Sequence, residues 1–155
     1  LGVVMIAHGV GHARNLDGTA RWFESIGFRA APLQARLSAA GELAIGTALI
    51  LGLLTGPALA GLIATMTIAY WSVHRAAGFF VYARPDEGWE YVATLAIVAA
   101  ALAVTGAGSL SVDAWLGLDD LLDGAVGLGI AGAGVLAGGL QLAATWRRPV
   151  DQPTA

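Results

Sequence analysis

The chain has 155 residues, of which 57% are hydrophobic and only 12% are charged, and its formal net charge is −3. Soluble domains carry about 25% charged residues, so this composition predicts an integral membrane protein and argues against a soluble domain. The absence of cysteine excludes disulfides, thiol redox relays, cysteine-ligated iron–sulfur clusters and covalently attached c-type haem. The sequence contains no cluster of basic residues of the kind that indicates nucleic-acid binding.

The first of five apolar segments runs from Leu1 to about His12. A helix of this length spans about 18 Å, which is less than the ~30 Å hydrocarbon core, so we expect further residues to precede Leu1. The segment does not resemble a signal peptide, because it lacks a basic n-region and a cleavage site. The polar stretch 13–36 follows, with four arginines and the aromatics Trp22, Phe23 and Phe28, and it predicts a short interfacial helix.

The remaining apolar segments predict four further membrane spans. The second is expected at about 37–54 and the third at about 58–77, with a tight turn at "LTGP" (54–57) between them. The loop "ARPDEG" (83–88) separates the third span from the fourth, at about 89–105. The fifth, at about 124–145, follows "GAGSLSVDAWLGLDDLLD" and ends in "WRRP". The predicted fold class is therefore all-α, a polytopic membrane helical bundle.

The fifth span is rich in glycine. Gly134 and Gly138 form a GxxxG pattern, and Gly127 and Ala131 extend the same ridge of small residues. Such ridges let two helices approach closely in a membrane, so we predict helix packing at Gly134 and Gly138. The alternative is a chance pattern, because Gly and Ala are so common in this segment.

The charges divide between the two ends of the predicted bundle. If the five spans alternate in direction, all eight basic residues fall on one membrane face, and they are Arg14, Arg21, Arg29, Arg36, Arg75, Arg84, Arg147 and Arg148. The other face carries Asp113, Asp119, Asp120 and Asp123. The positive-inside rule then predicts that the arginine face and the C-terminus are cytoplasmic.

Several ionisable residues lie within or beside the predicted spans, where each costs about 2.5–3.5 kcal/mol on insertion scales. The alternation of the spans places all of them at a similar depth near the arginine face, which predicts a polar layer inside the bundle. The candidate residues of this layer are His8, His12, Glu42, His74 and Glu90, with the aromatics Tyr91 and Trp71 beside them.

Three interpretations of the polar layer stay open: a structural hydrogen-bonded clasp, a pocket for a ligand or quinone, and a metal site. The Glu-x-x-His pair of di-iron bundles is absent, and nothing beyond two histidines near one end favours b-type haem, so no metal is assigned. For some residues a simpler role competes with membership of the polar layer. Arg75 is expected to extend toward lipid headgroups, and an acid such as Glu90 is favoured in the first turn of any helix.

An ordered set of short motifs resembles the DoxX family of small membrane proteins. These motifs are "AHG" (7–9), "WFESIGF" (22–28), "GELAIG" (41–46), "ILGLLTGP" (50–57), "HRAAGFF" (74–80), "EGWEY" (87–91) and "GAGSLSVD" (106–113). The resemblance implies a four-helix core over about 1–115 in a bacterial or archaeal plasma membrane. Residues 116–155 then add a linker, the fifth helix and a short tail.

The resemblance also implies a functional context. The family is named for a subunit associated with a terminal quinol oxidase, and related DoxD proteins belong to a thiosulfate:quinone oxidoreductase. Its characteristic polar residues fall on His8, Glu42, His74 and Glu90. The family usually has Lys one turn after its first His, whereas this chain has His12.

Two functional hypotheses follow. In the first, the protein is a membrane subunit associated with an oxidoreductase and binds quinone or a small ligand in the polar layer. It carries no recognisable flavin, nicotinamide or iron–sulfur motif, so any redox role needs a partner protein. In the second, it is a non-catalytic scaffold or assembly subunit, its polar layer is a structural clasp, and its fifth helix docks a partner. A carrier function has little support, because the chain has no internal repeat.

Overall fold

The computed structural model describes residues 1–82 and 87–149, apart from the side chain of Asp120, and the regular secondary structure of this part of the chain consists of helices joined by loops. Its one β-type pairing is an isolated antiparallel bridge between Phe28 and Trp146. The helices are α1 (Gly2–Arg14), α2 (Leu16–Ser25), α3 (Ala31–Leu51), α4 (Thr55–Ser72), the 3-10 helix η1 (His74–Ala77), α5 (Glu90–Thr105), α6 (Val112–Leu116), α7 (Asp119–Leu122) and α8 (Gly124–Thr145). The predicted all-α class is confirmed for these residues.

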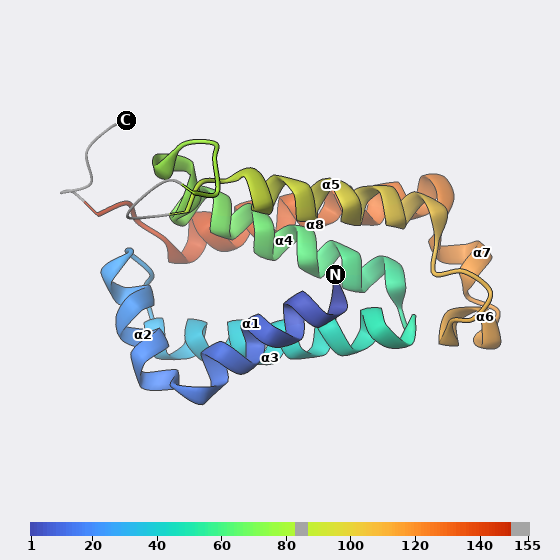
Figure 1. Cartoon of the computed structure of the whole chain (residues 1–155), viewed down its shortest axis with the longest axis horizontal. Coiled ribbons are helices and arrows are strands. Elements are labelled where there is room, and N and C mark those ends of the chain that lie inside the picture. The colour runs from blue at the N-terminus through green and yellow to red at the C-terminus, as the bar shows by residue number, and fades with distance from the viewer. Residues whose placement is uncertain (83–86, 150–155) are drawn as a thin grey trace.

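The long helices form two groups that lie against each other (Figure 1). In one group α1 packs along α3, and in the other α4 packs against α5 and α8. The helix α4 is central, because Leu59 and Leu62 are fully buried and it also contacts α3. The short helix α2 closes one end of the bundle, and α6 and α7 lie at the other end (Figure 1). The described arginine-bearing segments gather at the α2 end, whereas Arg84 lies outside the described residues.

Two predicted boundaries differ from the structure. The turn expected at 54–57 lies earlier, at 52–54, where Gly52 and Leu54 adopt left-handed backbone with φ of +61° and +47°. Pro57 instead falls in the first turn of α4, where its missing N–H costs no helical hydrogen bond. The third predicted span, 58–77, ends as an α-helix at Ser72 and continues as η1 after the break at Val73.

Membrane-spanning capacity is clearest for α8. Within the described residues, α8 is the one helix that is both long and apolar enough to cross a membrane, and α5 is a shorter apolar helix of 16 residues. The helix α1 has only 13 residues, and Arg36 and Glu42 lower the mean hydropathy of α3. Length and composition therefore support one of the five predicted spans directly.

The small-residue face of α8 packs on α4. Gly134 and Gly138 are both buried, and a Cβ atom built at Gly138 would lie 2.7 Å from the carbonyl oxygen of Ala64. A Cβ at Gly134 would collide with the carbonyl oxygen of Ala60. Contacts of this kind are made with backbone, which cannot rotate away, so the spacing between α4 and α8 depends on glycine at these positions.

We expect Gly134→Ala to lower the free energy of unfolding by about 1–3 kcal/mol, because the added methyl group forces α4 and α8 apart. Gly132 is the matched control, since it lies on the same helix and a Cβ there meets nothing within 4 Å. Gly132→Ala should be neutral or stabilising by up to about 1 kcal/mol, because alanine favours the helix interior. Thermal unfolding of both variants in mild detergent measures the difference, and equal melting temperatures would contradict the tight contact.

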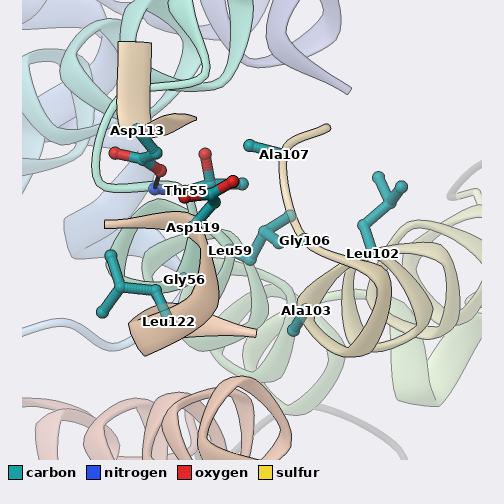
Figure 2. A pocket seen from close by; sticks show the side chains of 10 residues that line it. All are labelled: Thr55, Gly56, Leu59, Leu102, Ala103, Gly106, Ala107, Asp113, Asp119 and Leu122. Atoms are coloured by element: carbon teal, nitrogen blue, oxygen red, sulfur yellow. Dashed lines mark hydrogen bonds between the residues drawn. The ribbon is translucent and has the colours of Figure 1, made fainter. Parts of the chain in front are cut away.

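The far end of the bundle is fixed by one buried carboxylate. Asp113 on α6 is only 1% exposed, and its two oxygens accept hydrogen bonds from the backbone N–H groups of Leu54 (2.7 Å) and Thr55 (2.8 Å). Figure 2 shows this side chain directed at the first turn of α4, beside a small cavity that Asp119 also lines. The start of a helix presents unpaired N–H groups and a positive dipole end, so the carboxylate caps α4 from a distant segment.

Candidate ligand-binding site

A cavity of about 730 Å³ lies between the two helix groups, and residues of α2 contribute to its lining. Its walls come from α1, α2, α3, α4, η1, α5 and α8. Most of the wall is apolar and includes the aromatic rings of Trp22, Phe23 and Phe28. The polar lining consists of His8, His12, Gln34, Ser38, Glu42, Thr65, Ser72, His74, Tyr91, Gln141 and Thr145.

Glu42 is the central polar group on one wall. It is 4% exposed, and its Oε1 accepts a hydrogen bond of 2.8 Å from the hydroxyl of Ser38, one helical turn earlier on α3. Its other oxygen, Oε2, lies 3.1 Å from Nδ1 of His12, and the same Nδ1 lies 3.3 Å from the Ser38 hydroxyl. The ring nitrogen is close enough for an ion pair, but Oε2 receives no well-aligned hydrogen bond from the described residues. Glu42 therefore carries a buried carboxylate oxygen with unused acceptor capacity in the wall of the cavity.

The close approach of α1 to α3 brings His12 to Glu42. A Cβ atom at Gly9 would lie 3.0 Å from the carbonyl oxygen of Ala39, and one at Gly46 would lie 2.7 Å from that of Gly2. Glycine at these two contacts lets the helix backbones touch, as in other small-residue interfaces. The short spacing between α1 and α3 allows the His12 and Glu42 side chains to meet.

A second polar group lies on the opposite helix group. The hydroxyl of Tyr91 is 2.7 Å from Nε2 of His74, and Nδ1 of His74 is 2.6 Å from the carbonyl oxygen of Glu87. A carbonyl oxygen can only accept, so the neutral imidazole carries its proton on Nδ1, and Nε2 accepts from the Tyr91 hydroxyl. The backbone of Glu87 therefore fixes the tautomer and orientation of His74.

Hydrogen bonds join the start of α3 and the loop before it to the end of α8 and the residues after it, beside α2. The amide of Gln141 donates to that of Gln34 at 3.0 Å, and the indole N–H of Trp146 donates to the carbonyl oxygen of Ile26 at 2.8 Å. Two backbone hydrogen bonds reinforce this connection, from Arg29 to Thr145 (2.7 Å) and from residue 147 to residue 27 (2.9 Å). This connection links the loop before α3 to the end of α8.

The structure brings together five of the seven predicted polar-layer residues. His8, which is exposed, joins His12, Glu42, His74 and Tyr91 in the lining of the cavity. Two residues lie elsewhere. The Oε2 atom of Glu90 accepts a hydrogen bond of 3.1 Å from the backbone N–H of Val81, and Trp71 faces outward with 46% of its surface exposed. Arg75 stacks on the ring of Trp71, with Cζ 4.5 Å from the ring centroid.

Some lining residues were not among the sequence candidates. Ser38 bridges His12 and Glu42, and Gln34 pairs with Gln141. The two glutamines interrupt apolar helices just as Glu42 does, so the reasoning that selected Glu42 could have found them. The aromatics Trp22 and Phe23 were assigned to the interface, but α2 turns them toward the cavity. Only the fold reveals that direction.

The His and Glu side chains do not cluster as metal ligands. Across residues 1–82 and 87–149, no group of three His, Cys, Asp or Glu side chains is placed to hold one ion. The His12–Glu42 pair and the His74–Tyr91 pair occupy separate walls of the cavity. Their arrangement suits hydrogen bonding to a small molecule between them.

The fold and the cavity define a small, all-helical bundle of membrane-protein composition with an internal, polar-lined pocket. Residues 1–75, just under half of the chain, match the family model described as DoxX, and this match supports the assignment of the chain to the DoxX family. The matched region covers α1 to α4 and ends in η1, so it includes His8, His12, Glu42 and His74. No curated protein and no solved structure matches the chain.

Proposed function

We propose that this protein is a polytopic subunit of a prokaryotic plasma membrane, that it associates with a membrane oxidoreductase, and that its cavity binds a quinone or a similar small ligand. In this proposal the α2 end of the bundle, with its arginines, faces the cytoplasm. The chain itself carries no motif for a flavin, nicotinamide or iron–sulfur cofactor, so the partner protein supplies the electrons.

The outer surface of the bundle supports the polytopic membrane arrangement. Large apolar side chains are exposed on several helices, not only on α8. Examples are Val3 on α1 (72%), Ile50 on α3 (56%), Ile97 on α5 (69%) and Leu140 on α8 (72%). Water-soluble monomers rarely expose apolar surface on this scale, whereas lipid covers it without cost. Shorter helices such as α1 and α5 then cross the membrane where the bilayer thins locally around them.

The observation that carries the ligand proposal is the cavity with Glu42 in its wall. Its volume of about 730 Å³ lies within the 300–1,000 Å³ typical of small-molecule sites. Such sites combine apolar walls with a few well-placed polar groups, as this cavity does. A quinone has an apolar ring and two carbonyl oxygens, and it fits this pattern. The ring of His12 is the candidate donor to a quinone carbonyl, because the Ser38 hydroxyl already donates to Glu42 and the Tyr91 hydroxyl to His74.

To test this proposal, we would purify the protein in mild detergent, extract it with organic solvent and quantify quinone per mole of protein. We expect bound quinone, retained on gel filtration, together with co-purification of a membrane dehydrogenase or oxidase. The control is an unrelated helical membrane protein from the same cells, which reports quinone carried by residual lipid. A quinone content equal to that of the control would contradict the ligand proposal.

A structural clasp is the second candidate function, and a specific observation favours it. Hydrogen bonds and ion pairs across the polar layer already join separate elements, α1 to α3 through His12 and Glu42 and η1 to α5 through His74 and Tyr91. Under this alternative the cavity holds lipid or water, and the protein acts as a scaffold for its partner. Substitution of Glu42 or Tyr91 would then reduce stability without changing any ligand affinity.

A further inference from the structure

A second hollow lies on the outside of the bundle, where the C-terminal ends of α4 and α8 meet. It measures about 430 Å³ and shares no lining residue with the main cavity. Its wall on α8 is formed by Gly139, Leu142 and Ala143, and Trp71 of α4 forms the other side. A Cβ atom at Gly139 would meet nothing within 4 Å, so the absence of a side chain there leaves the groove open.

One end of this groove is strongly basic. Arg147 and Arg148 line it directly, and Arg75 lies against Trp71 with its Cζ 4.5 Å from the ring centroid. The Nη1 atom of Arg147 donates to the carbonyl oxygens of Ala143 (3.0 Å) and Trp146 (2.8 Å) at the end of α8. Those bonds hold the guanidinium at the mouth of the groove, with Nε and Nη2 as its other donor atoms. Among the described lining residues none is acidic.

We propose that this groove is a binding site for an anionic phospholipid. An acyl chain lies along Gly139, Leu142 and Ala143, and the phosphate binds the guanidinium groups of Arg147 and Arg148. The charge argues for this ligand, because arginine binds phosphate oxygens through paired N–H donors. Basic pockets at a cytoplasmic surface also select anionic headgroups, and this second reason rests on the orientation in the proposed function. The apolar length of the groove argues for a lipid over free phosphate, which has nothing to place beside Leu142. Trp71 fits this arrangement, because tryptophan side chains favour the boundary between the acyl chains and the headgroups.

The test uses tryptophan fluorescence in nanodiscs that contain either phosphatidylglycerol or phosphatidylcholine with brominated acyl chains. Trp71 and Trp146 both line the groove, so a bound brominated chain quenches them. We expect stronger quenching by the anionic lipid at equal mole fraction. In the double variant Arg147→Gln, Arg148→Gln the half-saturating mole fraction should rise by about fivefold per arginine, or about 25-fold.

A second pair of variants tests the groove without touching its charge. Gly139→Leu fills the apolar floor and should abolish the preference, whereas Gly132→Leu, at another open position of α8, should preserve it. Thermal unfolding confirms that each variant is folded. Equal quenching by the two lipids, or an unchanged preference in Gly139→Leu, would overturn the proposal. Loss of the preference in excess soluble glycerol 3-phosphate would also overturn it, because the site would then recognise phosphate without the chain.

Discussion

Replacement of Asp113 by alanine is expected to lower the free energy of unfolding by about 3–5 kcal/mol. The side chain accepts two hydrogen bonds from the first turn of α4, and a hydrogen bond to a charged group contributes about 1.5–3 kcal/mol. The alanine variant leaves the N–H groups of Leu54 and Thr55 without their acceptor. The backbone N–H of residue 113, which donates to the carbonyl oxygen of Gly52 at 2.9 Å, is kept in the variant, so the loss comes from the side chain alone.

Thermal unfolding in detergent measures this loss, with Glu24→Ala as the control because Glu24 is an exposed acid on α2. Asp113→Asn should fall between the two, since it keeps one acceptor oxygen but loses the charge that favours the helix N-terminus. If Asp113→Ala were as stable as Glu24→Ala, the capping contact would contribute nothing to the free energy of unfolding. The ligand affinity of the folded Asp113 variants should not change, because the carboxylate lies at the opposite end of the bundle from the cavity.

Glu42→Gln is expected to weaken quinone binding by at least tenfold while the protein stays folded. The amide keeps the size of the side chain, but it removes the charge beside His12 and replaces one acceptor oxygen with a donor. Glu42 acts through His12, because a carboxylate and a quinone carbonyl are both acceptors. Loss of the charged partner that holds the His12 ring costs about 1.5–3 kcal/mol, which corresponds to a factor of about 10 to 150 in affinity. The affinity is measured by equilibrium titration of the purified protein with a short-chain benzoquinone.

Glu90→Gln is the matched control for this measurement. Glu90 was assigned to the same polar layer from the sequence, but its side chain binds the backbone of Val81 and does not line the cavity. The control should therefore keep the affinity of the parent protein. Equal losses in the two variants would indicate a general effect of charge or stability, and no loss in Glu42→Gln would favour the structural clasp.

The sequence predicted most of the helices because their apolar runs are long and their boundaries carry Gly, Pro or charged residues. It also predicted that His8, His12, Glu42, His74 and Tyr91 share one region, since alternating helices return to the same membrane depth. Depth, however, says nothing about the direction of a side chain around its helix axis. For that reason the same reasoning placed Glu90 in the layer, although the loop before α5 occupies its carboxylate.

Other features depend on contacts that no local pattern encodes. Trp71 lies at the right depth but on the outer side of α4, whereas α2 folds back so that Trp22 and Phe23 face the cavity. The capping of α4 by Asp113 joins positions almost 60 residues apart, and in the sequence Asp113 is one acid among several near the far membrane face. The loop motif "ARPDEG" lies largely outside the described residues, so its prediction stays a prediction.

Photolabelling with an azidoquinone tests the central claim most directly, because it reports where the ring of the ligand lies. The purified protein is illuminated with the probe, digested and mapped by mass spectrometry, with and without excess unlabelled quinone. We predict competed labelling on α1, α3 and α5, at or beside His12, Ser38, Glu42 and Tyr91. Labelling confined to the exposed outer faces of α5 and α8, and insensitive to competition, would show that the cavity does not bind quinone.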